Sequence, residues 1–134
     1  MIVVDTNVIA GLFLGKEAPS VAEQVLARDP KWAVPMLWRY EFRNVLAGEI
    51  RRSGMSFDRA VRIASLAEAQ VRGREFVAPS EAVLELVSTT RCTAYDCEFV
   101  ALAQRIGAKL VTSDRQVLTA FPETAVSPEA FVSY

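Results

Sequence analysis

The chain alternates short apolar runs with segments of helical periodicity, and this alternation restricts its fold more than any other feature. The first run, IVV at residues 2–4, is β-branched and uninterrupted, as in strands buried on both faces of a parallel sheet. The polar triplet DTN at residues 5–7 ends it, and apolar residues then recur at helical spacing through Phe13. The triplet therefore lies where a strand passes into a helix.

Turn and capping signals divide the rest of the chain in the same way. We expect strands at residues 1–5, 32–35, 75–77, 109–112 and 125–126, and helices at 6–14, 36–52, 56–71, 80–87 and 93–106. We also expect a turn at 15–19, a helix that ends at Asp29-Pro30, a short helix after Asp114 and a helical turn from Ser127. Strands that alternate with helices form a parallel sheet sandwiched between helices, so the sequence predicts an α/β fold. No repeat or linker interrupts the chain, and we expect one domain over residues 1–134.

The absence of histidine restricts the chemistry. It excludes Ser-His-Asp catalysis, histidine acid–base chemistry and histidine metal sites. Any hydrolysis must then depend on carboxylates, which with hydroxyls and amides are ligands of Mg²⁺ and Mn²⁺. Cys92 and Cys97 lack the spacing of a zinc site, and we interpret them as packing residues. No apolar run approaches the roughly 20 residues of a membrane span, and Asp5 interrupts the one candidate signal sequence, so we expect a cytoplasmic protein.

Two acidic residues follow expected strands, each with hydroxyl or amide side chains beside it. Asp5 is in the DTN triplet, and Asp114 ends the sequence TSD at residues 112–114. The carboxyl ends of neighbouring parallel strands meet at the same edge of a sheet, where α/β folds bind their ligands. Either residue alone is equally well explained as a helix N-cap.

Glu41 lies on the apolar face of the helix expected at 36–52, in the sequence RYEFRNVLAG. An ionised carboxylate there is costly unless something compensates its charge. A salt bridge to an arginine and a shared acidic or metal site both remain possible.

The next helix, expected at 56–71, should pack on the core through an apolar set: Phe57, Val61, Ala64 and Leu66.

Asp96 lies at the margin of the apolar face of the helix expected at 93–106. The core residues of this helix are expected to be Tyr95, Phe99, Leu102 and Ile106. Because Thr93 comes three residues before Asp96, a variant of the capping box explains the acid as well as a metal site does. Taken together, however, three or four converging carboxylates repel one another unless divalent cations lie among them. Such a site activates water for attack on a phosphodiester.

These motifs are similar to those of a known family. The segments VVDTNVIAGLF, RYEFRNVLAG and AYDCEFVALAQRIGAKLVTSD, in this order and over essentially the whole chain, resemble the PIN-domain ribonucleases. The resemblance is to the small stand-alone toxins of VapB/VapC-type toxin–antitoxin pairs. It implies a three-layer α/β/α sandwich around a short central parallel sheet and a Mg²⁺- or Mn²⁺-dependent endoribonuclease. It also implies a homodimer and an antitoxin whose tail occupies a groove near the acids.

The resemblance also assigns roles to residues. The family's acids match Asp5, Glu41, Asp96 and Asp114. Asp5, Asp96 and Asp114 would hold the metal, and Glu41 would hold metal or orient the attacking water. The supporting polar residues match Asn7 and Thr112, with Thr6 and Ser113 beside them. The chain departs from many relatives at Phe99, where they have a tyrosine; this position is expected to lie in the core.

Positive charge gathers in the middle of the chain, although the net charge is −1. Between residues 39 and 74, eight arginines accompany four acidic residues. Arginine binds phosphates well. Arg51, Arg52, Arg59 and Arg62, around the turn between two expected helices, are therefore candidate contacts for RNA or for an acidic stretch of a partner. A solvated helix surface explains the same composition.

Two other functions remain as alternatives. A phosphoacceptor signalling domain would also carry an acid after its first strand, but this chain lacks the acidic pair there and the lysine after Lys109 that such a domain needs. A non-catalytic nuclease-like fold that binds RNA or protein is the second alternative. RNA binding without cleavage under any divalent ion would favour it.

Overall fold

The computed structural model describes residues 1–16 and 19–133. Within these residues, five strands form one sheet in the order β3-β2-β1-β4-β5, and every neighbouring pair is parallel. The strands are β1 (Ile2–Val4), β2 (Trp32–Pro35), β3 (Glu75–Phe76), β4 (Leu110–Val111) and β5 (Ala125–Val126). The predicted parallel sheet is thus confirmed. Part of the turn predicted at 15–19 lies outside the described residues.

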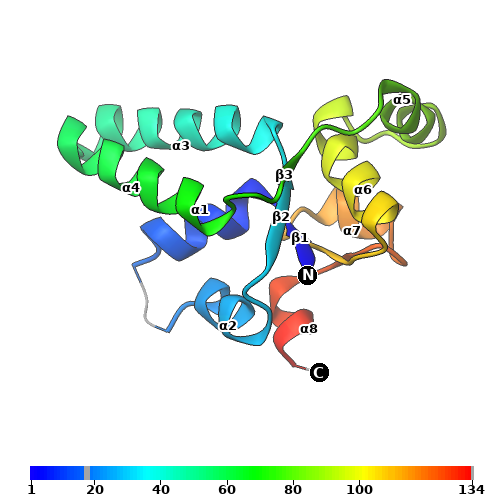
Figure 1. Ribbon diagram of the computed structural model, residues 1–134, viewed down its shortest axis with the longest axis horizontal. Coiled ribbons are helices and arrows are strands. Elements are labelled where there is room, and N and C mark those ends of the chain that lie inside the picture. Colours follow the sequence, from blue (N-terminus) through cyan, green and yellow to red (C-terminus); the bar gives the residue numbers. More distant parts are fainter. Residues whose placement is uncertain (17–18, 134) are drawn as a thin grey trace.

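The sheet is completed by helices on both faces. The helices are α1 (Thr6–Leu14), α2 (Val21–Arg28), α3 (Leu37–Ser53), α4 (Phe57–Gln70), α5 (Ser80–Thr89), α6 (Ala94–Ile106), α7 (Arg115–Ala120) and α8 (Pro128–Val132). Figure 1 shows α1, α3 and α4 on one side of the strands and α5, α6 and α7 on the other, while α2 packs on α8. The predicted three-layer α/β/α sandwich is therefore confirmed. No helix of the described part is both long and apolar enough to cross a membrane.

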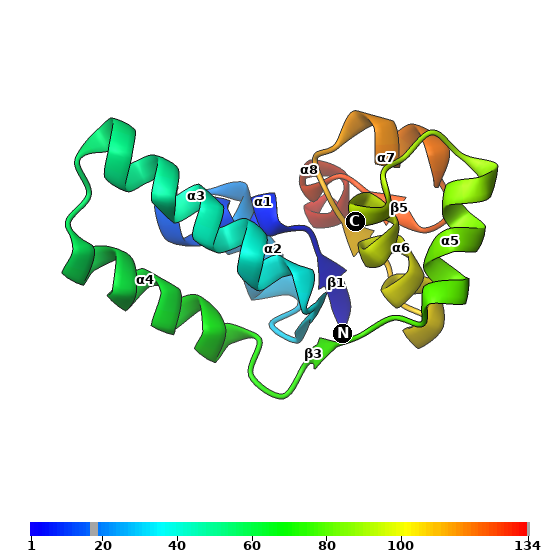
Figure 2. The same ribbon diagram turned by 90° about the horizontal axis from the view of Figure 1, so that it is seen from above.

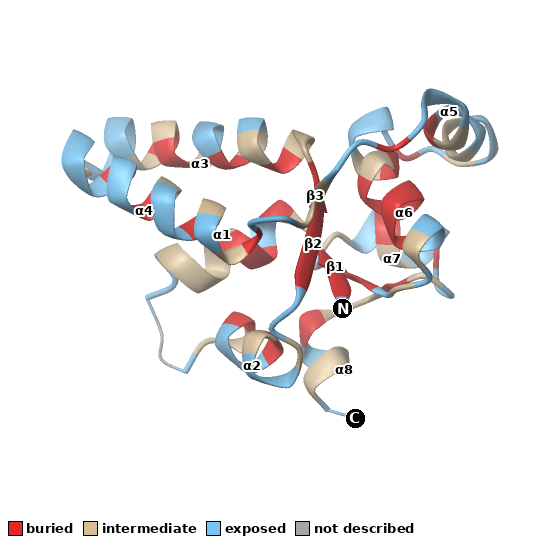
Figure 3. Cartoon of the chain, in the orientation of Figure 1, coloured by how far each residue is buried: buried red, intermediate tan, exposed pale blue. Residues whose placement is uncertain are grey.

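Strand β1 lies at the centre of the sheet because it is apolar on both faces. All three of its residues are buried, and Val3 pairs with Ala33 of β2 on one side and with Leu110 of β4 on the other. Figure 3 shows the buried residues gathered in the strands and on the helix faces that cover them. The strand order reverses beside β1, and we use the word crevice for the place where folds of this kind bind their ligands, outside the carboxyl ends of β1 and β4.

The helix ends follow the capping signals in the sequence. Helix α3 ends at Gly54 and α6 at Gly107, both in the left-handed conformation that glycine adopts without strain, with φ of 68° and 66°. Ser56 accepts a hydrogen bond from the N–H of Arg59 and caps α4. Each observed boundary lies within two residues of the predicted one for these two helices and for α4.

Helices α3 and α4 form an antiparallel hairpin that extends away from the sheet (Figure 2). The predicted core face of α4 is wrong: Phe57 is 74% exposed, and Val61 and Leu66 are also exposed. The residues that α4 buries are Ala60, Ile63 and Ala67. These three residues also recur at helical spacing, and they form the face that meets the rest of the protein.

Helix α6 is largely as expected, with one correction. Phe99 is buried, as predicted for the position where many relatives of the family carry tyrosine. Tyr95 is 65% exposed and does not belong to the core. It lies in the first turn of α6, and the buried face of the helix begins two residues later at Cys97. Cys92 and Cys97 are buried free thiols, which confirms their interpretation as packing residues.

Candidate active site

Asp5 and Thr112 join the ends of the two central strands. Asp5 occupies the N-cap position of α1, but its side chain makes no capping hydrogen bond, so the predicted capping role of this carboxylate is wrong. Its Oδ2 instead accepts a hydrogen bond from Oγ1 of Thr112 at 2.7 Å. The contact spans 107 positions of the sequence and depends on the pairing of β1 with β4.

Thr112 also contacts the second strand-end acid. Its fully buried hydroxyl accepts a hydrogen bond from the backbone N–H of Asp114 at 3.1 Å. Oδ1 of Asp114 accepts from the N–H groups of Gln116 and Val117 at 2.9 and 3.1 Å, so the capping interpretation is correct for this residue. One hydroxyl thus links both acids at the crevice.

Glu41 reaches the same region from α3. Its Oε1 accepts a hydrogen bond from Oγ1 of buried Thr6 at 2.8 Å, which ties α3 to the start of α1. None of the ion pairs among the described residues includes Glu41, so the salt-bridge alternative is wrong. The nearby Arg39 pairs with Glu68 and Glu75 instead.

Asp96 lies in the first turn of α6. Its backbone N–H donates to Oγ1 of Thr93 at 3.1 Å, but its carboxylate does not return the hydrogen bond. Helix α2 has the complete version, in which Ser20 and Glu23 each cap the other. Only half of the capping box is therefore present at Asp96, and the carboxylate is not committed to the helix end.

The acids are close enough for their charges to act on one another. Burial raises the pKa of Asp5, the charges of Asp96 and Asp114 raise it further, and hydrogen bonds from Thr112 and the Thr6 N–H oppose the rise. The pKa of Glu41 is raised by burial and then by the charges of Asp5 and Asp96. Within residues 1–16 and 19–133, no ion pair involves any of these four acids.

The cluster is open rather than closed around a cavity. In the described ranges, no three acidic or thiol side chains stand close enough together to enclose a metal ion. The donor set is nevertheless made of carboxylate and hydroxyl oxygens, which suit hard divalent cations. Since no arginine or lysine of the described residues neutralises them, the acids can bind a cation without first breaking an ion pair.

The remaining polar residues predicted for the site lie beside the cluster. Asn7 and Ser113 line a small pocket of about 80 Å³, together with Ser20 at the start of α2. Ser20 was not predicted from the sequence. Its only visible signal is the capping box of α2, which gives no indication of a neighbouring site.

The four candidate arginines lie on the α3–α4 hairpin, away from the core. Arg51, Arg52, Arg59 and Arg62 are all exposed, and no ion pair of the described residues includes them. Not every arginine of the basic segment is available, however. Arg74 donates hydrogen bonds to the backbone carbonyls of Trp32 and Gln70, and Arg39 is held by two glutamates, so the surface charge of this segment is smaller than the sequence indicates.

The parallel strands, in this order and covered by helices on both faces, define an α/β fold. Its carboxylates lie where the strand order reverses, between β1 and β4. Residues 2–125 match the family model of the PIN domain. The chain belongs to the PIN-domain family.

Relatives with known names agree with this assignment. The chain is 30% identical to ribonuclease VapC3 of Pyrobaculum aerophilum over 124 residues, which cover 90% of this chain and 95% of the relative. The crystal structure of PAE2754 from the same organism has a TM-score of 0.77 at 22% identity and covers 98% of this chain and 86% of its own. A toxin–antitoxin complex from Klebsiella pneumoniae has a TM-score of 0.72 at 20% identity and covers 96% of this chain and 98% of its own. These two structures show the fold.

Proposed function

We propose that the protein is a divalent-metal-dependent endoribonuclease and the toxin of a toxin–antitoxin pair. The single observation that carries the proposal is a group of four acids without a cationic partner among the described residues: Asp5, Glu41, Asp96 and Asp114. The charges of other members of the group add to the raised pKa of Asp5 and of Glu41. The similarity to ribonuclease VapC3 supports the reaction, and the structural likeness to a toxin–antitoxin complex supports the biological role.

The oxygen ligands suit Mg²⁺ or Mn²⁺. We assign Asp5, Asp96 and Asp114 to hold the ion and Glu41 to hold it or to orient the attacking water. A bound divalent ion lowers the pKa of water and neutralises charge that develops on the phosphodiester.

The chain's own hydroxyls position these acids. Thr112 donates to Asp5 and Thr6 donates to Glu41, so one oxygen of each carboxylate is held by a threonine hydroxyl. The raised pKa of Glu41 makes its carboxylate a better proton acceptor toward water than an exposed glutamate. Asn7 and Ser113 lie at the edge of the cluster, where they can hydrogen-bond to substrate oxygens.

The proposed partners are an RNA substrate, an antitoxin and a second copy of the chain in a homodimer. The hairpin offers two kinds of contact for them. Helix α4 exposes apolar side chains that a protein partner could bury: Phe57, Val61 and Leu66. The arginines at the turn of the hairpin attract phosphates or an acidic segment. We place the protein in the cytoplasm and treat residues 1–134 as one domain.

The decisive test is cleavage of a mixed RNA substrate by the purified protein, with Mg²⁺ or Mn²⁺ and with a chelator. We expect cleavage that requires the ion and that disappears in Asp96→Asn. Glu85→Gln, which removes an exposed acid on α5, is the matched control and keeps full activity. Binding of RNA without cleavage under every divalent ion would contradict the nuclease and favour a non-catalytic binding module.

The proposed role of the hairpin arginines is tested by salt dependence. Alanine at Arg51, Arg52, Arg59 and Arg62 together should flatten the plot of log affinity for RNA against log salt by about 0.7 for each phosphate that these arginines neutralise. An unchanged slope would show that these four arginines do not contact RNA phosphates and belong to an ordinary solvated helix surface.

A further inference from the structure

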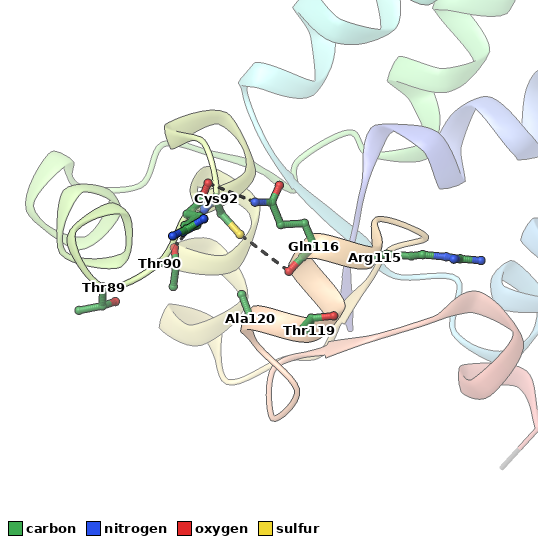
Figure 4. A pocket seen from close by; sticks show the side chains of 8 residues that line it. Thr89, Thr90, Cys92, Arg115, Gln116, Thr119 and Ala120 are labelled. Atoms are coloured by element: carbon green, nitrogen blue, oxygen red, sulfur yellow. Dashed lines mark hydrogen bonds between the residues drawn. The ribbon is translucent and has the colours of Figure 1, made fainter.

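A hollow of about 580 Å³ lies between the C-terminal end of α5 and helix α7. Figure 4 shows Thr89 and Thr90 at the end of α5, with Gln116 and Thr119 on α7. The volume falls within the range of pockets that hold small organic ligands, which is roughly 300 to 1,000 Å³. The hollow is therefore large enough for one nucleotide.

Two contacts fix the shape of this hollow. Nε2 of Gln116 donates a hydrogen bond to the backbone carbonyl of Arg91 at 3.3 Å. The thiol of Cys92 points at the backbone carbonyl of Gln116 at 4.0 Å (Figure 4). The loop between α5 and α6 is thus fastened to α7, and the two walls are held relative to each other without a ligand.

The position of the hollow connects it to the acids. Its wall at the start of α7 begins with Arg115, the residue directly after Asp114. Its other wall ends at Cys92, next to Thr93, which caps the helix that carries Asp96. Both walls of the hollow therefore adjoin, along the chain, residues that carry or cap the elements of these two acids.

The charge of the hollow suits a polyanion. Arg91 and Arg115 both line it and are exposed, and neither takes part in an ion pair of the described residues. Figure 4 shows the side chain of Arg115 directed away from the other lining side chains, so its guanidinium is placed to contact a phosphate beyond the hollow and not one inside it. Guanidinium groups bind phosphate through paired hydrogen bonds.

The lining between the arginines combines small apolar groups with hydrogen-bonding groups. Ala120 and the methyl groups of the threonines offer apolar contact to a base, while the Thr hydroxyls and the Gln116 amide can bond to a ribose 2′-hydroxyl or a base edge. An acidic peptide could use the arginines and, through its backbone, the hydrogen-bonding groups, but the small apolar patch beside them matches the flat face of a base. The combination favours a nucleotide over a peptide.

We propose that the α5–α7 hollow is a subsite that holds a nucleotide of the RNA substrate next to the phosphodiester bound at the acids, with Arg91 and Arg115 on the flanking phosphates. This inference rests on the proposed ribonuclease function. It adds a place where the substrate is gripped on the side of the crevice opposite the α3–α4 hairpin.

The test measures RNA binding separately from cleavage. A fluorescent single-stranded RNA of mixed sequence is titrated with the metal-free full-length protein in chelator, and affinity is followed by anisotropy. Arg91→Ala removes one arginine, and Ala120→Trp fills the hollow. Arg105→Ala on α6 and Ala27→Trp on α2 are the controls, since both residues are exposed and lie outside the hollow.

We expect each test variant to bind RNA about tenfold more weakly, and the controls to bind as the unchanged protein does. The double variant Arg91→Ala/Arg115→Ala should lower the salt slope by about 1.4, or 0.7 for each phosphate. RNA carrying a photoreactive uridine analogue should cross-link within residues 89–92 or 115–120. Circular dichroism of each variant shows that the fold is retained.

Wild-type affinity and salt slope in the variants would overturn the subsite, even if the protein cleaves RNA as proposed. Weakened binding of an acidic peptide with unchanged binding of RNA would also overturn it, because the hollow would then serve a protein partner. If the protein binds RNA without cleaving it and the variants lose binding, the subsite stands and the nuclease proposal fails.

Discussion

Helix α3 contributes to two groups of carboxylates: one is paired with an arginine, and the other has no cationic partner among the described residues. At the β3 edge, Arg39 donates to both oxygens of Glu75 at 2.8 Å and also pairs with Glu68. Two residues further along, Glu41 accepts a hydrogen bond from the hydroxyl of Thr6 and forms no ion pair with any described residue. The pKa of Glu75 is lowered, chiefly by its hydrogen bond from Arg39, whereas burial raises the pKa of Glu41.

The difference between the clusters lies in whether the protein itself neutralises the carboxylates. An arginine only two positions from Glu41 is directed to the other cluster, so the acids at the crevice keep charge that the protein itself does not neutralise. A paired carboxylate stabilises the fold, but an unpaired one is available to a cation from solution. The two clusters can therefore be separated by substitutions that affect activity in one case and stability in the other.

The largest expected effect is on catalysis. Glu41→Gln should lower the rate of metal-dependent RNA cleavage at least about a hundredfold. The amide keeps an oxygen that accepts from Thr6 and removes repulsion with Asp5 and Asp96, so the urea midpoint should stay the same or rise. Cleavage at the unchanged rate would show that Glu41 has no role in catalysis and does not differ in function from Glu75.

A smaller effect, on stability, is expected at the paired cluster. Arg39→Met should lower the free energy of unfolding by about 2 kcal/mol, because it leaves Glu75 with 14% side-chain exposure and no cation. Cleavage per folded molecule should not change. Urea denaturation measures the first quantity and active-site-normalised rates the second; a loss of activity without a loss of stability would contradict the assignment.

Thr112→Val separates positioning from charge. The variant keeps the shape of the side chain but removes the hydroxyl that donates to Asp5 and accepts from Asp114, and it should cost about 1.5 kcal/mol. Loss of the hydrogen bond also raises the pKa of Asp5 further, so the acidic limb of the pH–rate profile should move to higher pH. Thr112→Ser should restore that limb, which a purely structural role would not predict.

The smallest effect is the pH dependence of stability, and its sign differs between the clusters. The pKa of Glu41 is raised in the fold, so its contribution to the stability of the metal-free protein falls as pH rises above 4.5 through the raised value. The pKa of Glu75 is lowered, so its contribution is present above 4.5 and is lost as pH falls through the lowered value. Urea midpoints measured against pH for Glu41→Gln and Glu75→Gln should therefore deviate from the parent in opposite directions; parallel curves would show that the clusters do not differ.

The fold and the approximate place of the acids were predictable because their signals are local. Apolar runs ended by polar residues marked the strand ends at Asp5 and Asp114, and helical periodicity placed Glu41 on an apolar face. The partners of these acids were not predictable. Thr112 reaches Asp5 only through the pairing of β1 with β4, and the direction of Arg39 depends on where β3 lies.

The face of α4 shows a second limit. Apolar residues occur on more than one side of this helix, and periodicity favoured the large ones, Phe57, Val61 and Leu66. The structure buries a second set at helical spacing instead, Ala60, Ile63 and Ala67. Periodicity alone does not decide which of two such sets faces the core.

The pairing of β1 with β4 also has a consequence for the order of synthesis. The ribosome makes Asp5 and Glu41 well before Asp96, Thr112 and Asp114. Until β4 and the residues after it have been made and β4 has docked beside β1, Asp5 lacks its hydroxyl donor and the crevice lacks Asp114. A nascent chain therefore gains the complete cluster only after Asp114 has been made and the sheet has closed across the 107 positions between Asp5 and Thr112.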